Sequence, residues 1–356
     1  MPHLVVPGEP DRRLFSPPSR HAVVADDRLS ADAALRTVSA GAALLWRGGY
    51  PAARRLLDAV NRRIPAPPPD DYPAYRAHRA RRARLLSLLY VPLDPGHVVP
   101  LRRAPDVRAA CTAVHGPLEV PAAMPLRELL GVLSAAEWRR KGLFVPALGA
   151  RIHPHYGVFA PVRQEYVDLV AETPLPASAL AFDIGTGTGV LAAVLACRGV
   201  RRVVATDADP RAVACATGNL ARLGFGERTE VVLTDLFPPG RAPLVVGNPP
   251  WLPGRPRTPL DHAVYDPGSR MLRGFLDRAR RHLTPDGEAW LVLSDLAEHL
   301  GLRSRSELLG WIASAGLRVG GRTDATPRHP RALDPADPLH RARAAEVTSL
   351  WRLRPG

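Results

Sequence analysis

Lysine is nearly missing from this 356-residue sequence: Lys141 is the only one among 48 basic residues, so the positive charge is essentially all arginine. Arginine in place of lysine, with abundant Ala, Pro and Gly, is typical of a G+C-rich coding sequence. The formal net charge is +14, of which residues 1–150 contribute +9 (22 basic, 13 acidic) and the rest +5 (26 basic, 21 acidic). A basic surface favours polyanions such as RNA, so nucleic acid stays open as a partner of the N-terminal part.

Cysteine is scarce and long apolar runs are absent. The three cysteines (Cys111, Cys197 and Cys215) are odd in number and far apart, so they form neither a disulfide framework nor a zinc signature, and we expect no metal site. No apolar run approaches the roughly 18 residues of a membrane span. The start of the chain lacks the basic-then-apolar order of a signal peptide. We therefore expect a cytoplasmic protein without a membrane partner.

The first part of the chain is predicted to be helical. About 25 proline-containing residues without periodicity predict an arm, and PAPPPDD (65–71) predicts a stiff linker. Apolar spacings of three and four residues predict helices over 30–46, 51–63, 75–90 and 125–142. Residues 1–150 are thus expected to form a mostly helical domain, which we interpret as the substrate-recognition domain, and 151–356 a second, catalytic domain.

The second part alternates between short apolar segments and helical segments of 10–15 residues. This alternation predicts an α/β fold with a parallel, doubly wound sheet. Two late segments, 317–323 and 346–353, are expected to form a final pair of strands.

A glycine-rich turn follows the first of these apolar segments. Gly185, Gly187 and Gly189 come after a predicted strand and open a predicted helix, so the backbone can turn sharply and approach a ligand. Asp183 precedes the turn. A carboxylate there would repel a pyrophosphate but would tolerate a ligand with an ammonium and a sulfonium group, which favours S-adenosylmethionine (SAM) over a nicotinamide dinucleotide.

Two more carboxylates end the next predicted strands. Asp207 follows Gly187 by 20 residues and is placed to accept hydrogen bonds from both ribose hydroxyls of a nucleoside. Asp235 comes just after the following strand and could accept from an adenine amino group.

The segment GNPPW follows a further apolar strand. Two consecutive prolines fix an extended chain and remove two backbone donors. What remains is an acceptor surface, the side-chain oxygen of Asn248 and the carbonyl of Pro249, with Trp251 as a flat face on which a planar group can stack. Two acceptors would pin the hydrogens of an NH₂ group and leave its lone pair free for attack. We therefore take Asn248, Pro249 and Trp251 as the catalytic residues.

In this order the motifs resemble the class I SAM-dependent methyltransferases of the NPPY/F/W type, with a Rossmann-like sheet. Within that group, residues 151–300 are similar to the HemK-like glutamine-N5 methyltransferases of release factors and to the "methyltransferase small" rRNA guanine-N2 enzymes. The matching segments are FDIGTGTGVLA, VVATDADPRAVACATGNLARLG, TDLF, VVGNPPW and LDRARRHLTPDGEAWLVLS. The resemblance implies SAM at Asp183, Gly185, Gly187, Asp207 and Asp235, and the acceptor nitrogen at Asn248 and Pro249.

Three acceptors remain open at this point. A protein glutamine amide follows from the resemblance, an amine of an RNA base from the basic N-terminal part, and a small amine, amide or guanidine from the unfamiliar sequence of that part. Trp251 stands where the glutamine enzymes usually have Tyr. Two other classes are less consistent with the sequence. A nicotinamide-dependent oxidoreductase leaves Asn-Pro-Pro-Trp without a role, and a non-catalytic binding module would not need the full set of motifs.

Overall fold

The computed structural model describes residues 22–256, 261 and 263–356, so most of the predicted N-terminal arm lies outside the described residues. The chain divides into one compact unit that ends at Glu137 and a second from Trp138 to Gly356. Among the described residues, no helix is long and apolar enough to cross a membrane.

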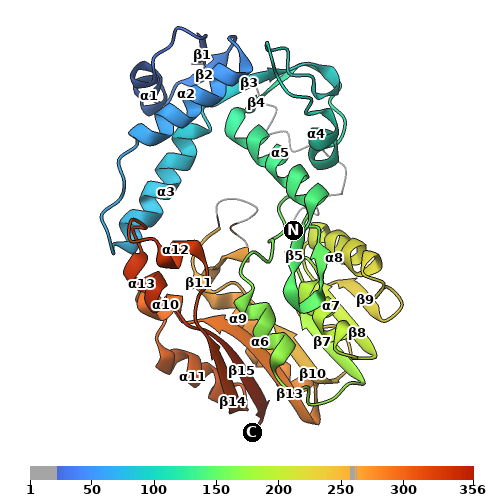
Figure 1. The fold of residues 1–356 in the computed structure, drawn as a ribbon. Coiled ribbons are helices and arrows are strands. Elements are labelled where there is room, and N and C mark those ends of the chain that lie inside the picture. The colour runs from blue at the N-terminus through green and yellow to red at the C-terminus, as the bar shows by residue number, and fades with distance from the viewer. Residues whose placement is uncertain (1–21, 257–260, 262) are drawn as a thin grey trace, which may run out of the picture. The chain divides into compact units, whose positions relative to one another are not determined.

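The first unit combines helices with a four-stranded sheet (Figure 1). Its strands are β1 (Ala22–Ala25), β2 (Ala43–Trp46), β3 (Leu89–Leu93) and β4 (Ala122–Pro125). They lie in the order β1-β2-β3-β4, the first two pairs parallel and the last antiparallel. Its helices are α1 (Ala31–Ser39), α2 (Tyr50–Arg63), α3 (Tyr72–Leu86), α4 (Arg108–His115) and α5 (Leu126–Lys141), the last crossing the division between the units.

The structure corrects the prediction of one helix over 30–46. The helix does begin after Ser30, whose side chain caps the amide of Ala33 at 3.2 Å, but it ends at Ser39. Gly41 then adopts a φ of +88°, a left-handed conformation that terminates the helix. The following ALLW continued the helical spacing only by coincidence, and it forms the buried strand β2. The predicted third helix likewise ends at Leu86, and β3 follows it.

The second unit is built on a seven-stranded sheet in the order β14-β15-β13-β10-β7-β8-β9. Its strands are β7 (Leu180–Ile184), β8 (Arg202–Asp207), β9 (Thr229–Leu233), β10 (Ala242–Gly247), β13 (Leu283–Ser294), β14 (Leu317–Ala325) and β15 (Thr348–Pro355). All the pairings are parallel except those of β15, which runs antiparallel to β13 and β14. The doubly wound α/β sheet and the final strand pair are confirmed.

Helices cover both faces of this sheet (Figure 1). One apolar core joins the sheet to α6 (Glu165–Glu172), α7 (Val190–Cys197) and α8 (Pro210–Arg222). The other joins it to α9 (Arg270–His282) and α11 (Arg305–Ser314). The small hairpin of β5 (Leu143–Val145) and β6 (Ala150–Ile152) buries Val145 and Ile152 in the first core, which explains why this unit begins before residue 150.

Short elements stand outside the main sheet. After the GNPPW segment, β11 (Leu252–Pro253) pairs with β12 (Tyr265–Asp266). Helix α10 (Leu296–His299) follows β13, and α12 (Pro330–Leu333) and α13 (His340–Ala345) lie between β14 and β15. A small apolar cluster joins β11, β12, α10 and α13, because Leu252, Tyr265 and Leu296 pack with Ala342.

Candidate functional site

The candidate site lies where the sheet reverses its strand order. From β7 the chain goes first to β8 and β9 on one side and then to β10 and β13 on the other. Open α/β sheets bind their ligands at such a switch point, beyond the carboxyl ends of the strands. Gly247 pairs with Ile184 at the end of β10 and β7, so Asn248 and Gly185 leave the sheet on adjacent strands. The structure thus brings the glycine-rich turn and the GNPPW segment together.

Glycine is required in the turn for two reasons. Gly185, Gly187 and Gly189 have φ angles of +71°, +56° and +81°, which side chains rarely adopt. A Cβ at Gly185 would also stand 2.3 Å from the side-chain methyl of Met271, and one at Gly189 would stand 3.1 Å from Cα of Ala216. Nothing lies within 4 Å of the Cβ direction at Gly187. The positive φ angles are therefore the main reason for glycine at all three positions, Ala216 crowds the third, and the space beside Gly187 is open.

Asp183 lies under the turn. Its buried carboxylate accepts a hydrogen bond from the Thr186 hydroxyl at 2.6 Å and another from the Ala192 amide at 3.0 Å. Burial raises the pKa of Asp183 to about 6; these hydrogen bonds oppose the shift, and the charge of Asp207 adds to it. Asp183 thus fixes the turn onto α7 and brings negative charge to the floor of the site.

Asp207 closes the turn from the neighbouring strand. One carboxylate oxygen accepts from the Gly187 amide at 3.0 Å and the other from the Asp209 amide at 2.9 Å. Burial raises the pKa of Asp207, and the backbone hydrogen bonds oppose the shift. Each oxygen keeps a further lone pair for a hydroxyl. The Gly187 and Ala192 amides, which could have bound a phosphate, are instead used by these two carboxylates.

Asp235 follows β9 on an exposed stretch. Its side chain is 60% exposed and lies 3.9 Å from Arg270, a long and solvated ion pair. No described contact connects it with the turn, so its role toward an adenine stays a prediction.

The GNPPW segment has an internal hydrogen bond that its sequence did not suggest. The Trp251 indole donates to Oδ1 of Asn248 at 2.8 Å, which leaves that oxygen one further lone pair. The Trp251 ring packs against both apolar cores, and the Arg163 guanidinium lies 4.8 Å from its centroid. Arg163 covers one face of the ring, so an acceptor can stack only on the ring surface that Arg163 leaves uncovered.

The sequence analysis missed three charged residues: Arg163, which lies over Trp251, and the two carboxylates that Arg163 contacts. Arg163 donates to Glu165 at 2.8 Å and to Glu346 at 2.9 Å. Both carboxylates are 2% exposed, and their charges raise the pKa of Arg163 against the effect of burial. The sequence signal for Arg163 and Glu165 was their place just before and at the start of α6, in the segment YGVFAPVRQEYVDLV (156–170). Glu346 is 183 positions away from Arg163 and gives no local signal.

Asn219 of α8 is a further missed residue. Its amide donates to the carbonyls of Thr188 at 3.0 Å and His153 at 3.3 Å, and its oxygen accepts from the His153 amide at 2.9 Å. It therefore joins the lead-in segment before α6 to the glycine-rich turn. Among the described residues, no group of three or more His, Cys, Asp or Glu could hold a metal ion.

Comparison with known proteins places this unit in a family. The family model of the methyltransferase small domain matches residues 150–305. These residues run from β6 to the start of α11 and include every site residue predicted from the sequence, whereas Glu346 lies beyond them.

Individual relatives match over alignments of about the same length. A release factor glutamine methyltransferase of Cereibacter sphaeroides is 33% identical over 153 residues, 39% of this chain and 52% of that protein. A tRNA1(Val) (adenine(37)-N6)-methyltransferase of Tolumonas auensis is 32% identical over 165 residues, 44% of this chain and 68% of that protein. The chain thus spans about half the length of the release-factor relative.

Among solved structures, the ribosomal protein L11 methylase of Lactobacillus delbrueckii subsp. bulgaricus is 18% identical, with a TM-score of 0.38 over 54% of this chain and 78% of that one. The family match and the sequence relatives agree with the strand order and motifs described above. The chain belongs to the methyltransferase small family of class I SAM-dependent methyltransferases.

Proposed function

We propose that this protein transfers a methyl group from SAM to a planar nitrogen, and that the acceptor is the side-chain amide of a protein glutamine. One observation carries the proposal. At the end of β10, beside the glycine-rich turn, the oxygen of Asn248 is fixed by the Trp251 indole at 2.8 Å and is followed by two prolines without amide hydrogens. Such a surface accepts hydrogen bonds from an NH₂ group.

The residues of the turn fit SAM better than a dinucleotide. Two carboxylates, Asp183 and Asp207, lie at the turn, and their negative charge suits a ligand with an ammonium and a sulfonium group. Amides at Gly187 and Ala192 are already bonded to these carboxylates, so they are withdrawn from a pyrophosphate. The free lone pairs of Asp207 would hold the ribose hydroxyls. Gly187 would let the amino-acid part lie against the backbone, and Asp235 would accept from the adenine amino group.

Alignment is the main work that the chain's own residues perform. SAM supplies a methyl group on a positively charged sulfur, which is a good leaving group. Asn248 and the Pro249 carbonyl would each accept one hydrogen from the acceptor nitrogen, so its lone pair is directed to the side of the turn. Well-oriented reactants gain the equivalent of several kcal/mol, about 7–11 in favourable cases. The partly buried Trp251 fixes Asn248 and excludes water from one side of it.

The relative that acts on release factors supports a glutamine amide as the acceptor. A primary amide offers one planar NH₂ group with two hydrogens, which matches the two acceptors that follow β10. A primary amide also needs only a small area of the Trp251 ring for stacking. This suits the site, because Arg163 covers one face of that ring.

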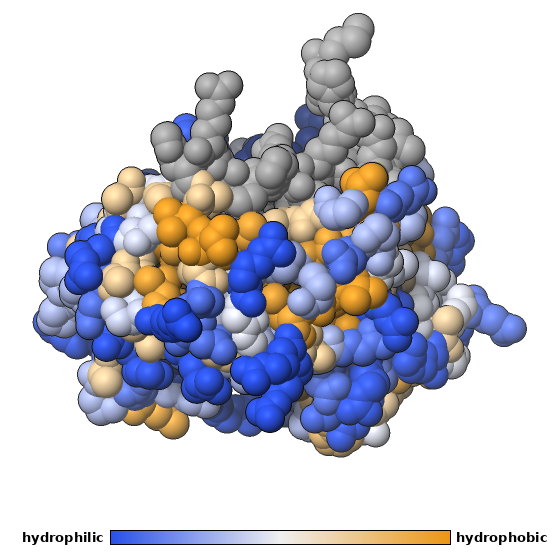
Figure 2. All heavy atoms as spheres, turned by 90° about the horizontal axis from the view of Figure 1, so that it is seen from above, coloured by the Kyte–Doolittle hydropathy of each residue, from blue (hydrophilic) through white to orange (hydrophobic). Residues whose placement is uncertain are grey.

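An amine on an RNA base is the second candidate. Its support is helix α3, which carries five arginines and no acidic residue. The pKa of Arg82 is lowered by burial and by the nearby charges of Arg127 and Arg79, so cations crowd here. A tRNA enzyme among the relatives agrees with this candidate. It ranks second because the surface is mixed: Figure 2 shows apolar areas between the hydrophilic side chains of the face in view.

Titration calorimetry with SAM and with NAD tests the cofactor assignment. We expect SAM to bind and NAD not to bind. In Asp207→Ala the loss of two ribose hydrogen bonds, each about 1–2 kcal/mol, should weaken SAM binding by about 2–4 kcal/mol. The Asp235→Ala variant is the matched carboxylate control, with a smaller loss because that side chain is exposed. Tight NAD binding without SAM binding would refute the proposal.

A further inference from the structure

Arg163 occupies a junction of four chain segments that are far apart in sequence. It lies in the lead-in to α6, and its guanidinium carbon stands 4.8 Å from the ring centroid of Trp251, which follows β10. Glu346, just before β15, accepts from it at 2.9 Å. The hydroxyl of Ser294, at the end of β13, donates to the same Glu346 oxygen at 2.5 Å. The ends of β13 and β10 and the start of β15 lie at one edge of the sheet, where Asn248 also lies.

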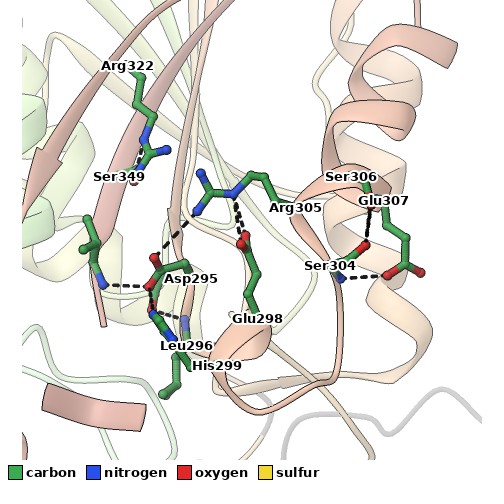
Figure 3. Close-up of polar contacts among 12 residues, drawn as sticks. Asp295, Leu296, Glu298, His299, Ser304, Arg305, Ser306, Glu307, Arg322 and Ser349 are labelled. Carbon is green, nitrogen blue, oxygen red and sulfur yellow. Dashed lines mark hydrogen bonds and ion pairs between the residues drawn. The ribbon is translucent and has the colours of Figure 1, made fainter. Parts of the chain in front are cut away.

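The Glu346 side of this junction is itself held firmly. The Val347 amide donates to Asp295 at 2.7 Å, and the Asp295 amide donates back to the Val347 carbonyl at 3.0 Å. Figure 3 shows Asp295 and Glu298 meeting the guanidinium of Arg305, at 3.6 Å and 2.8 Å. The carboxylate that receives Arg163 is therefore anchored to the end of β13 through backbone and ionic contacts.

The Trp251 ring and the two carboxylates together orient the guanidinium of Arg163. Its Nε and one terminal nitrogen each bond a buried carboxylate. The other terminal nitrogen, Nη2, is buried and finds no hydrogen-bond partner within the described part of the chain. An unsatisfied buried donor is destabilising, and departures of this kind concentrate at functional sites. The guanidinium stays stacked over Trp251 although Nη2 then has no acceptor.

We propose that Arg163 is a positioning residue for methyl transfer, which acts on Asn248 through Trp251. The proposal rests on the proposed function. Two fixed carboxylates hold the guanidinium, the guanidinium holds the indole plane, and the indole N–H fixes the oxygen of Asn248 that receives the acceptor. Without Arg163 the ring can tilt, and the Asn248 oxygen loses its fixed direction. The SAM-binding turn has no described contact with Arg163, so the cofactor should bind as before.

The first test follows the Trp251 indole directly and needs no acceptor. The chain has six tryptophans, and Trp251→Phe assigns the missing ¹⁵N-indole signal in the full-length protein. We expect the Trp251 N–H to be protected from solvent exchange. In Arg163→Met its exchange should become at least about tenfold faster, with the other indoles unchanged. An unchanged exchange rate of the Trp251 indole N–H would overturn the proposal that Arg163 acts on Asn248 through Trp251, which we call the relay.

The second test separates positioning from folding. With methyl-labelled SAM and the lysate fraction that accepts label from the wild type, kcat of Arg163→Met should fall at least about tenfold, because misplacement by about 1 Å costs on the order of 100-fold. The SAM dissociation constant, by calorimetry, should change less than about threefold, and Arg163→Lys should recover part of the rate. Equal losses in kcat and SAM affinity would indicate a purely structural role and overturn the proposal.

Arg322→Met is the matched control. Arg322 also stacks on a tryptophan, Trp351 at 4.9 Å, and its Nε donates to Asp324 and Ser349, the latter pair visible in Figure 3. This variant should change the Trp351 indole signal and leave transfer at the wild-type rate. An equal loss of transfer in Arg322→Met would show a general stability effect and contradict the relay.

Glu346→Gln guards against a misfolded Arg163→Met. Glutamine keeps the shape of the Glu346 side chain and removes its charge. This variant should make the exchange of the Trp251 indole N–H faster and should lower kcat, each by less than Arg163→Met does. Wild-type values for both would overturn the relay. A wild-type protein that fails to bind SAM would instead refute the proposed function, which keeps the two failures distinct.

Discussion

At the scale of single residues, we predict that the carboxylate of Asp183 links cofactor binding to pH. Its folded-state pKa of about 6 is above the usual value of 3.8 because it is buried. Its contribution to stability is therefore present at low pH and is lost as the pH rises through about 6. A bound cation favours the ionised carboxylate and lowers this pKa, so SAM binding near pH 6 should release a proton, and Asp207 should add in the same direction.

We therefore expect SAM affinity to fall as the pH drops from 7 to 5, by up to about tenfold per pH unit for one linked proton. Calorimetric titrations in two buffers with different ionisation enthalpies measure the released protons. The Asp183→Asn variant keeps acceptors for Thr186 and Ala192 and should show weaker pH dependence. Affinity that is flat with pH in the wild type, with no proton release, would contradict this assignment of charge at the turn.

The residue scale also shows how far the sequence could predict the site. Gly185, Asp207 and Asn248 could be located because each lies at the carboxyl end of its own strand, and these strand ends meet at one edge of the sheet. The partners of these residues were harder to predict. Asp183 was predicted as a SAM-binding carboxylate beside the turn, but its hydrogen bonds from Thr186 and Ala192 were not predicted. Arg163 and Glu346 meet only through the tertiary fold, across 183 positions.

At the scale of elements, one end of the β13–β15 pair carries an ion cluster around a buried carboxylate. Glu288 is 1% exposed and accepts from the Trp290 indole at 2.9 Å, from Arg352 at 2.7 Å and from Arg354 at 2.6 Å. These bonds lower the pKa of Glu288 to about 2 against the effect of burial. The stability that it contributes is therefore present above its usual pKa of 4.5 and is lost as the pH falls toward 2.

Glu288→Gln should lower the free energy of unfolding at pH 7 by about 1–3 kcal/mol, because the partly exposed guanidinium groups of Arg352 and Arg354 lose their anion. Urea denaturation at pH 7 and pH 3 measures the effect. The gap between wild type and variant should narrow at pH 3, and SAM binding of the folded variant should be unchanged. An equal difference in the free energy of unfolding between wild type and variant at both pH values would show that the ion cluster does not cause the difference.

Element prediction succeeded where the alternation was regular and failed where strands were short. The strands β7, β8 and β10 are bounded by turns and helices of ordinary length, and all were predicted. The four-stranded sheet of the first unit was missed because β1 and β2 have four residues each. ALLW also continued the apolar spacing of α1. Gly41 was the available signal, since a glycine just after a helical pattern favours its end.

At the scale of the whole molecule, we propose that the first unit selects the acceptor and contributes little to SAM binding. All the residues that we propose for cofactor binding lie between Asp183 and Asp235, in the unit that begins at Trp138. A chain that starts at Trp138 should bind SAM within about threefold of the full chain, if it folds, and should lose transfer to the true acceptor. Circular dichroism checks folding, and calorimetry and methyl transfer check the rest. Full transfer by the shortened chain would assign another role to the first unit.

The transfer of labelled methyl groups to nitrogen tests the central claim most directly. Full-length protein is incubated with methyl-labelled SAM and lysate separated into protein, RNA and small molecules, beside Asn248→Ala and Asn248→Asp. We expect label in the protein fraction, recovered as methylamine after acid hydrolysis of the amide. Asn248→Ala should lower kcat on the order of 100-fold with SAM affinity within about threefold, and Asn248→Asp, which keeps an acceptor, should retain more activity. Label on a nitrogen of RNA would select the second acceptor. Label on oxygen or carbon, no label at all, or wild-type turnover by Asn248→Ala would contradict the account.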